Sequence, residues 1–109
     1  MSSNQDTFSQ DQVFDVLSSA RRRYVIYYLR ERNEAVPLTE LARQVAAWEY
    51  DTDPEDLTDQ QEKRVYVSLY QTHVPKLEEV GIVEHDEDRG VVSLTDRSRE
   101  LDAHLSPSE

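Results

Sequence analysis

The sequence contains no cysteine, only two glycines and only four prolines among its 109 residues. Without cysteine the chain forms neither disulfides nor thiolate metal sites, and two glycines do not make a glycine-rich phosphate-binding loop. No apolar run approaches the roughly 20 residues that a membrane-spanning helix needs, and Met1 to Gln10 lack the apolar stretch of a signal peptide. We therefore expect a cytoplasmic protein with no membrane partner, and the length predicts one domain with a single modest core.

Positive charge is also scarce. Twelve basic residues oppose twenty-three acidic ones, which gives a formal net charge of −11, and only Lys63 and Lys76 are lysines. An acidic surface with little lysine is typical of halophilic proteins, because salt shortens the reach of self-repulsion, although an ordinary acidic domain has the same balance. This charge weighs against DNA binding, but less so in high salt, where counterion release contributes little affinity.

The clearest pattern in the chain predicts a long helix over 59–80. Thr58 and Gln61 have the spacing of a capping box, in which each side chain satisfies a free backbone N–H of the first helical turn. An apolar stripe follows at helical spacing and ends before Gly81, which suits the left-handed residue after a helix. Pro75 lies inside this helix, where it should remove a backbone hydrogen bond and introduce a kink.

Two short runs rich in β-branched residues follow the helix, at 82–85 and 91–94. The loop between them is acidic and ends in Gly90, which can adopt the positive φ that hairpin loops need. We therefore expect an antiparallel hairpin over 82–95. A helix followed by a hairpin is the second half of a winged helix-turn-helix domain.

The rest of the chain predicts shorter elements. Ser18 or Ser19 can cap a helix that ends at Arg32, and Thr39 can cap a helix to about Tyr50. Pro37 suits an edge strand because it has no N–H to donate. The predicted class is mainly α with a small antiparallel β hairpin (α+β). We also expect an acidic loop over 51–59 and a last helix over 95–104. The predicted winged helix-turn-helix domain covers residues 8–105, with tails over 1–7 and 106–109.

Polar side chains on one side of the long helix are candidates for reading DNA, because Gln, Arg and Ser can hydrogen-bond base edges in the major groove. The same residue types are normal on any solvated helix face. Basic residues elsewhere are candidates for phosphate contacts, or for surface pairing with the many carboxylates. The candidate base contacts are Gln60, Gln61, Arg64, Ser68 and Gln71, and the candidate phosphate contacts are Arg21, Arg22, Arg23, Lys63 and Arg89.

The acidic segment before the long helix does not match a metal-binding loop. Its carboxylates alternate as in a calcium-binding EF-hand, but Asp56 stands where that loop needs glycine, and Glu55 replaces an Asp or Asn. His73, His85 and His104 are scattered, with no partner at ligand spacing. We expect no metal, cofactor or small-molecule ligand, and the lack of any nucleophile motif predicts no enzymatic activity.

Apolar strips near both ends of the sequence predict a homodimer. A small monomer would leave such strips exposed, whereas a symmetric pair would bury them. The residues expected at this interface are Phe8, Val13, Phe14, Leu17, Leu101 and Leu105.

The stretch LYQTHVPKLEEVGIV, residues 69–83, resembles the recognition-helix end of ArsR-type winged-helix repressors, where His73 and Leu77 match the pattern. Residues 19–29 resemble the first helix of the same regulators. The run from His73 to Leu77 is similar to one in a haloarchaeal group of small, uncharacterised winged-helix domains. The resemblance covers residues 12–95 and implies a winged helix of haloarchaeal origin that acts in regulation. Metal sensing is not implied, because the cysteines of metal-sensing repressors are absent.

Two functions remain open after this reading. The first is a DNA-binding transcriptional regulator of a haloarchaeon, a dimer that binds double-stranded DNA through a recognition helix at about 59–80. The second is a winged-helix protein–protein interaction module without DNA binding. The fold favours the first function. The acidic hairpin tip, where only Arg89 is basic, and the additional aromatic row of Tyr66 and Tyr70 favour the second.

Overall fold

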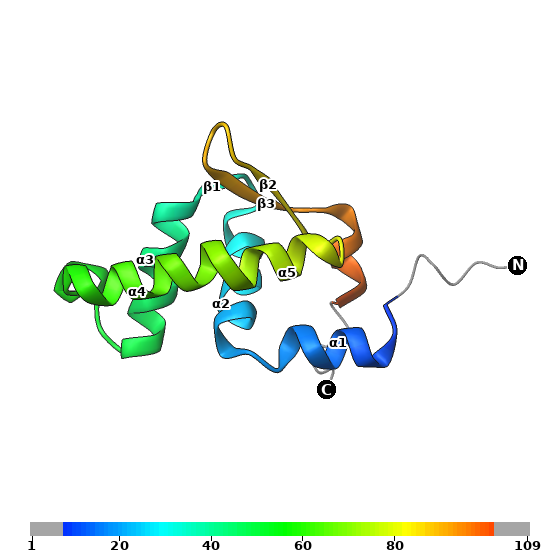
Figure 1. Cartoon of the computed structure of the whole chain (residues 1–109), viewed down its shortest axis with the longest axis horizontal. Coiled ribbons are helices and arrows are strands. Elements are labelled where there is room, and N and C mark those ends of the chain that lie inside the picture. Colours follow the sequence, from blue (N-terminus) through cyan, green and yellow to red (C-terminus); the bar gives the residue numbers. More distant parts are fainter. Residues whose placement is uncertain (1–7, 102–109) are drawn as a thin grey trace, which may run out of the picture.

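The structure is a computed structural model that describes residues 8–101, and most of these residues are helical (Figure 1). A small antiparallel sheet of three strands lies at one edge, and its hairpin projects from the helices. The α+β class expected from the sequence is therefore confirmed. The elements are α1 (Gln10–Leu17), α2 (Ala20–Arg32), β1 (Val36–Pro37), α3 (Leu38–Tyr50), η2 (Pro54–Asp56), α4 (Asp59–Ser68), η3 (Leu69–His73), α5 (Val74–Glu79), β2 (Val83–Asp86), β3 (Val91–Leu94) and η4 (Asp96–Leu101).

The long helix is present and consists of α4, η3 and α5 in succession across the whole molecule (Figure 1). Its capping box is confirmed, because the Thr58 hydroxyl accepts the Gln61 N–H at 3.0 Å and the Gln61 side chain accepts the Thr58 N–H at 3.0 Å. Gly81 follows its end with φ 86°. η3, which precedes Pro75, is a wider π-helical turn, and the helix continues through it into α5.

The sheet has the strand order β1-β3-β2, so β3 is central and β1 is an edge strand. Val36 pairs with Val92 and Pro37 pairs with Val91, which confirms the expected edge position of Pro37. The hairpin of β2 and β3 is also confirmed. Gly90 has φ 69°, and its N–H donates to the Asp86 carbonyl at 2.7 Å to close the loop.

One apolar core lies between the helices and one face of the sheet. α2 contributes Val25, Ile26 and Leu29, and β1 and β3 add Val36 and Val92. α3 packs against α2 and against α4, while α2 also contacts η3 and β2 contacts α5, so different elements support successive parts of the long helix. The remaining buried core side chains are Val13, Val16, Leu38, Leu41, Ala42, Val45, Ala46, Val65, Leu69, Val74, Leu77, Ile82, Val83 and Leu101.

One expected helix cap is wrong, and one expected helix is of another type. α3 begins at Leu38 and its N-cap is Pro37, so Thr39 does not cap it. β1 leads directly into α3, and the Leu38 N–H donates at 2.9 Å to the carbonyl of Gly90 in the hairpin loop. The helix expected over 95–104 is a 3-10 helix, η4, within the described residues, and residues 102–104 lie outside them. Thr95 precedes η4, and its hydroxyl donates to the Gly81 carbonyl at 2.6 Å.

Candidate nucleic-acid interface

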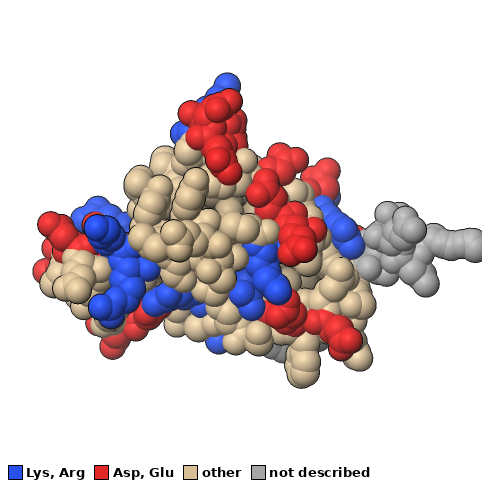
Figure 2. Space-filling model, viewed as in Figure 1, with Lys and Arg blue, Asp and Glu red and all other residues tan. Residues whose placement is uncertain are grey.

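The outward face of α4 and of the turn after it carries polar and basic side chains. Gln60, Lys63, Arg64 and Gln71 are exposed, whereas Val65 on the opposite side of the helix is fully buried. The spacing of 3.6 residues per turn aligns residues 60, 64 and 71 along one side, and Lys63 lies beside them. Figure 2 shows Lys and Arg side chains gathered over the α4 end of the molecule.

Lys63 and Arg64 form no ion pair with a residue in 8–101, unlike Arg21, Arg32, Arg43, Lys76 and Arg89. Arg64 influences Glu49, whose pKa is lowered chiefly by a hydrogen bond from Arg21 and also by the charge of Arg64. That carboxylate is already bound by Arg21 through both of its oxygens, at 2.6 and 2.7 Å. The Arg64 guanidinium therefore remains available to an external acceptor.

The structure distinguishes among the predicted base contacts. The Gln61 side chain is half-buried and is engaged in the capping box, and Ser68 is half-buried at the flank of the exposed face. Gln60, Arg64 and Gln71 are the three that share that face. Exposed residues 60, 63, 64 and 71 therefore form a compact polar surface, which we call the α4 face.

Sequence reasoning missed Val67, which lies on the α4 face with 37% of its surface exposed. Val67 is three residues after Arg64, and this spacing was the available signal, but an apolar residue in a helix is usually assigned to the core. Tyr70 is exposed beside it; its ring stacks on Tyr66 with centroids 6.2 Å apart and meets His85 of β2 edge-on at 6.0 Å. This aromatic row connects the long helix to the hairpin.

The predicted phosphate contacts Arg21 and Arg23 are engaged within the chain. Arg21 of α2 pairs with Glu49 of α3, as the alternative of surface pairing with carboxylates predicted. Arg23 donates to the Leu17 carbonyl at the C-terminal end of α1. A guanidinium at this end of a helix satisfies free carbonyl groups and complements the helix dipole. Neither side chain lies on the α4 face.

Arg22 is buried, with 7% of its surface exposed, so its expected place on a phosphate-binding surface is wrong. Its guanidinium donates to the carbonyls of Val16 at 3.0 Å and Asp15 at 2.6 Å, and its third bond joins it to His73 Nδ1 at 3.0 Å. A buried guanidinium needs hydrogen-bond acceptors to offset the hydration that it loses on burial. The sequence could not indicate this, because the acceptors are mostly backbone atoms of α1.

The hairpin tip is acidic, as the sequence indicated. Arg89 has a highly exposed side chain whose Nε lies 3.8 Å from the carboxylate of Asp86. Glu87 and Asp88 are exposed beside it, and Figure 2 shows red carboxylate atoms over most of the projecting hairpin. DNA phosphates would meet repulsion at this tip, where Arg89 is surrounded by carboxylates.

The residues expected at a dimer interface differ in how exposed they are in the structure. Val13 and Leu101 are buried in the core of the same chain, and Leu105 lies outside the described residues. Phe8 is half-buried, and the Arg97 guanidinium lies 4.3 Å from its ring centroid. These residues do not form one exposed apolar strip, because packing within the chain already covers part of it.

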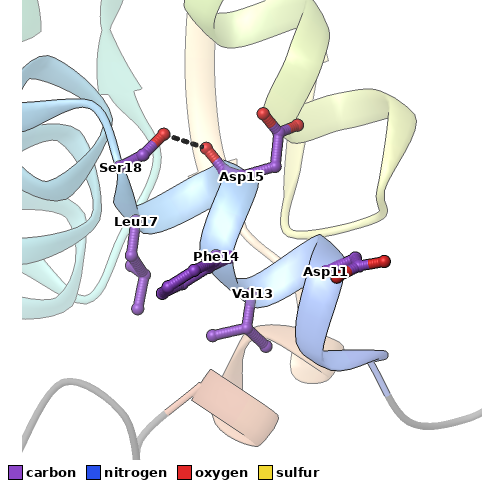
Figure 3. A pocket seen from close by; sticks show the side chains of 6 residues that line it. All are labelled: Asp11, Val13, Phe14, Asp15, Leu17 and Ser18. Carbon is purple, nitrogen blue, oxygen red and sulfur yellow. Dashed lines mark hydrogen bonds between the residues drawn. The ribbon is translucent and has the colours of Figure 1, made fainter.

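Phe14 is the exception, with 80% of its surface exposed on α1. It projects from the outer side of α1 beside Val13 and Leu17 (Figure 3). These side chains line a shallow groove of about 650 Å³ together with Asp11, Asp15 and Ser18. The groove is apolar in the middle and acidic at its edge.

Nothing in the described part resembles a metal site. No three His, Cys, Asp or Glu side chains of residues 8–101 converge on a common point. No helix within this range has the length and apolar character that crossing a membrane requires.

Comparison with protein families matches residues 14–93 to a domain of unknown function, DUF7344. The match extends from α1 into β3, and therefore includes the α4 face and the hairpin tip. No curated protein and no solved structure matches the chain. The chain belongs to the DUF7344 family of domains of unknown function.

Proposed function

We propose that the chain is a dimeric transcriptional regulator with a winged helix-turn-helix fold, and that it binds double-stranded DNA through the α4 face. A mainly helical chain in which the long helix is followed by a hairpin of a three-stranded sheet is compatible with this fold. α3 packs against α4 and supports it from behind. In this proposal, α4 is the recognition helix and the hairpin is the wing.

The observation that carries the proposal is the chemistry of the α4 face. Arg64 is exposed and forms no ion pair within residues 8–101, and Arg is the side chain best suited to the O6 and N7 atoms of guanine. Gln60 and Gln71 can each bind adenine through two hydrogen bonds, and Val67 can contact a thymine methyl group. The first half of a recognition helix is the part that reaches base edges, and Gln60 and Arg64 lie there.

The net charge of −11 limits how the protein can hold DNA. With Arg22 buried, Arg21 paired and the wing tip acidic, Lys63 is the remaining predicted phosphate contact on the α4 face. Each neutralised phosphate contributes about 0.9 to the slope of log affinity against log salt. We therefore expect a shallow salt dependence, so that binding persists at salt concentrations that release more basic DNA-binding domains.

The proposed dimer uses the exposed side of α1. Phe14 is the largest exposed apolar side chain there, and Leu17 adjoins it. Burial of an aromatic ring against its symmetry mate would remove this ring from water on both subunits. Two-fold symmetry would present two α4 faces to two half-sites on DNA.

The second candidate function is a protein interaction module that does not bind DNA. The acidic tip favours it, because Glu87 and Asp88 surround Arg89 and would repel the DNA backbone on the side where a wing approaches it. This module would use the aromatic row of Tyr66 and Tyr70 rather than the α4 face.

Selection of binding sites from random double-stranded DNA in molar potassium chloride tests the proposal. The regulator predicts enrichment of a short motif, duplicated with two-fold symmetry if the protein is dimeric. Selection without enrichment at both high and moderate salt would reject DNA binding and leave the interaction module.

A further inference from the structure

The surface formed by α2 and α3 carries an aromatic groove that the proposed DNA contacts do not use. It is lined by Tyr24, Tyr27, Arg30 and Glu31 of α2 and by Trp48 of α3, and has a volume of about 730 Å³. We propose that this groove binds an arginine or lysine side chain of a basic partner protein, which lies over Tyr27 and Trp48 beside Glu31.

The rings of the groove are held in place before any partner arrives. Tyr24 meets Trp48 at a centroid distance of 5.6 Å and an interplanar angle of 57°, and Tyr28 meets the same indole edge-on at 6.0 Å. The Tyr28 hydroxyl donates to Glu40 at 2.5 Å, which fixes this ring from behind. Trp48 and Tyr27 nevertheless remain 37% and 43% exposed. Trp48 is therefore held in place by its neighbours, and its surface and that of Tyr27 remain uncovered.

A cation is the ligand that these surfaces favour. The face of an aromatic ring is electron-rich and attracts ammonium and guanidinium groups, Trp most strongly. The same aromatic cluster already shows this contact, because the Arg32 guanidinium lies 5.7 Å from the Tyr28 ring centroid. Arg30, the basic residue of the lining, interacts with another group of the chain. The exposed Glu31 forms no ion pair or hydrogen bond with another residue of 8–101 and can pair with an incoming cation.

The overall charge of the protein indicates which class of partner would bind at the groove. With a net charge of −11, the protein as a whole attracts basic segments more strongly than acidic ones, and Glu31 places a carboxylate at the groove itself. Trp48 follows Thr39 on α3 by about two and a half turns, so the two side chains leave opposite sides of that helix. Thr39 lines the groove between α3 and α4. A partner held by Trp48 therefore lies on the other side of α3 from the groove that Thr39 and Lys63 line, and this proposal does not depend on DNA binding.

Trp48 is the only tryptophan of the chain, so its fluorescence reports on this groove directly. The probe is a ten-residue Gly/Ser peptide with two arginines, and its control is the same peptide with citrulline, which has nearly the same shape without charge. We expect saturable change in Trp48 fluorescence with the arginine peptide, and about tenfold weaker binding of the citrulline peptide. Equal binding of the two peptides, or no saturable change up to the solubility limit, would overturn the proposal.

Variants locate the contact. Tyr27→Leu keeps an apolar side chain but removes the ring, and should weaken binding of the arginine peptide severalfold, as should Glu31→Gln. Glu55→Gln removes an exposed carboxylate of η2, outside the groove, and should leave binding unchanged, with circular dichroism as the folding control for all three. Equal losses in Glu55→Gln and Glu31→Gln would contradict the assignment. Tighter binding of single-stranded DNA than of the peptide would overturn the basic partner in favour of DNA. Self-association abolished by Tyr27→Leu would overturn it in favour of a second copy of the chain.

Discussion

Arg22 donates a hydrogen bond from Nη1 to Nδ1 of His73 at 3.0 Å, and through this contact the first two helices are joined to the π-helical turn of the long helix. Because arginine only donates, His73 must accept through an unprotonated Nδ1. Burial lowers the pKa of His73 below its ordinary value, and the charges of Arg22 and Arg21 lower it further, while Glu49 opposes them. The neutral imidazole is therefore part of the folded structure.

This contact predicts a loss of stability in mild acid. The pKa of His73 is lower in the folded protein than its ordinary value of 6.5, so the unfolded chain binds the proton first. The free energy of unfolding should be constant above this value and should fall as the pH drops below it. Urea titrations at several pH values between about 5 and 8 measure this dependence, in a range where few other side chains titrate.

His73→Gln is the matched variant, because glutamine can accept the Arg22 hydrogen bond and does not titrate. It should flatten the pH dependence between about 5 and 8. Asp15, Glu40 and Glu49 have lowered pKa values, so their contribution is lost at lower pH and should remain in the variant. An unchanged pH profile would mean that His73 does not link stability to pH.

The capping box at the start of α4 offers a second prediction. Thr58→Ala removes the hydroxyl that accepts the Gln61 N–H and should reduce the free energy of unfolding by about 1 kcal/mol. Thr72→Ala, at an exposed position of η3, is the control and should change it by less than about 0.5 kcal/mol. Chemical unfolding measures both. A loss in Thr58→Ala no greater than that in the control would show that the cap contributes little.

Phe14 provides the prediction for the dimer. Phe14→Ser should convert a dimer into a monomer without loss of helical content, because Phe14 is 80% exposed and contributes little to the core. Light scattering in molar salt reports the mass, and Val67→Ser is the control at another exposed apolar site. A wild-type protein that is monomeric at high concentration would rule out the proposed dimer.

The local pattern of the sequence was sufficient for the long helix and the hairpin. Thr58, Gln61, Gly81 and Gly90 act through backbone groups close to them in the chain, so spacing alone predicted their roles. Pro37 was placed at a sheet edge for a similar reason, since a residue without an N–H cannot occupy a central strand.

Long-range packing decided what the sequence could not. The start of α3 depends on a carbonyl of Gly90, more than fifty residues away, and so the expected cap at Thr39 was wrong. Arg22 was predicted at the surface because its neighbours Arg21 and Arg23 are basic. It is buried instead, and its guanidinium donates hydrogen bonds to C-terminal carbonyls of α1. Of the candidate site, the sequence could name the polar residues of α4 but could not tell which of them are already engaged.

Affinity of the Arg64→Ala variant for a selected DNA site tests the central claim most directly. Arg64 is exposed and its removal should barely affect folding, which circular dichroism checks. If Arg64 binds a guanine edge, the variant should lose about 1–3 kcal/mol of binding free energy and its preference at one base position. Arg99→Ala, another exposed arginine outside the α4 face, should bind as the wild type does. Equal affinity of Arg64→Ala and the wild type would contradict DNA reading by α4 and favour the interaction module.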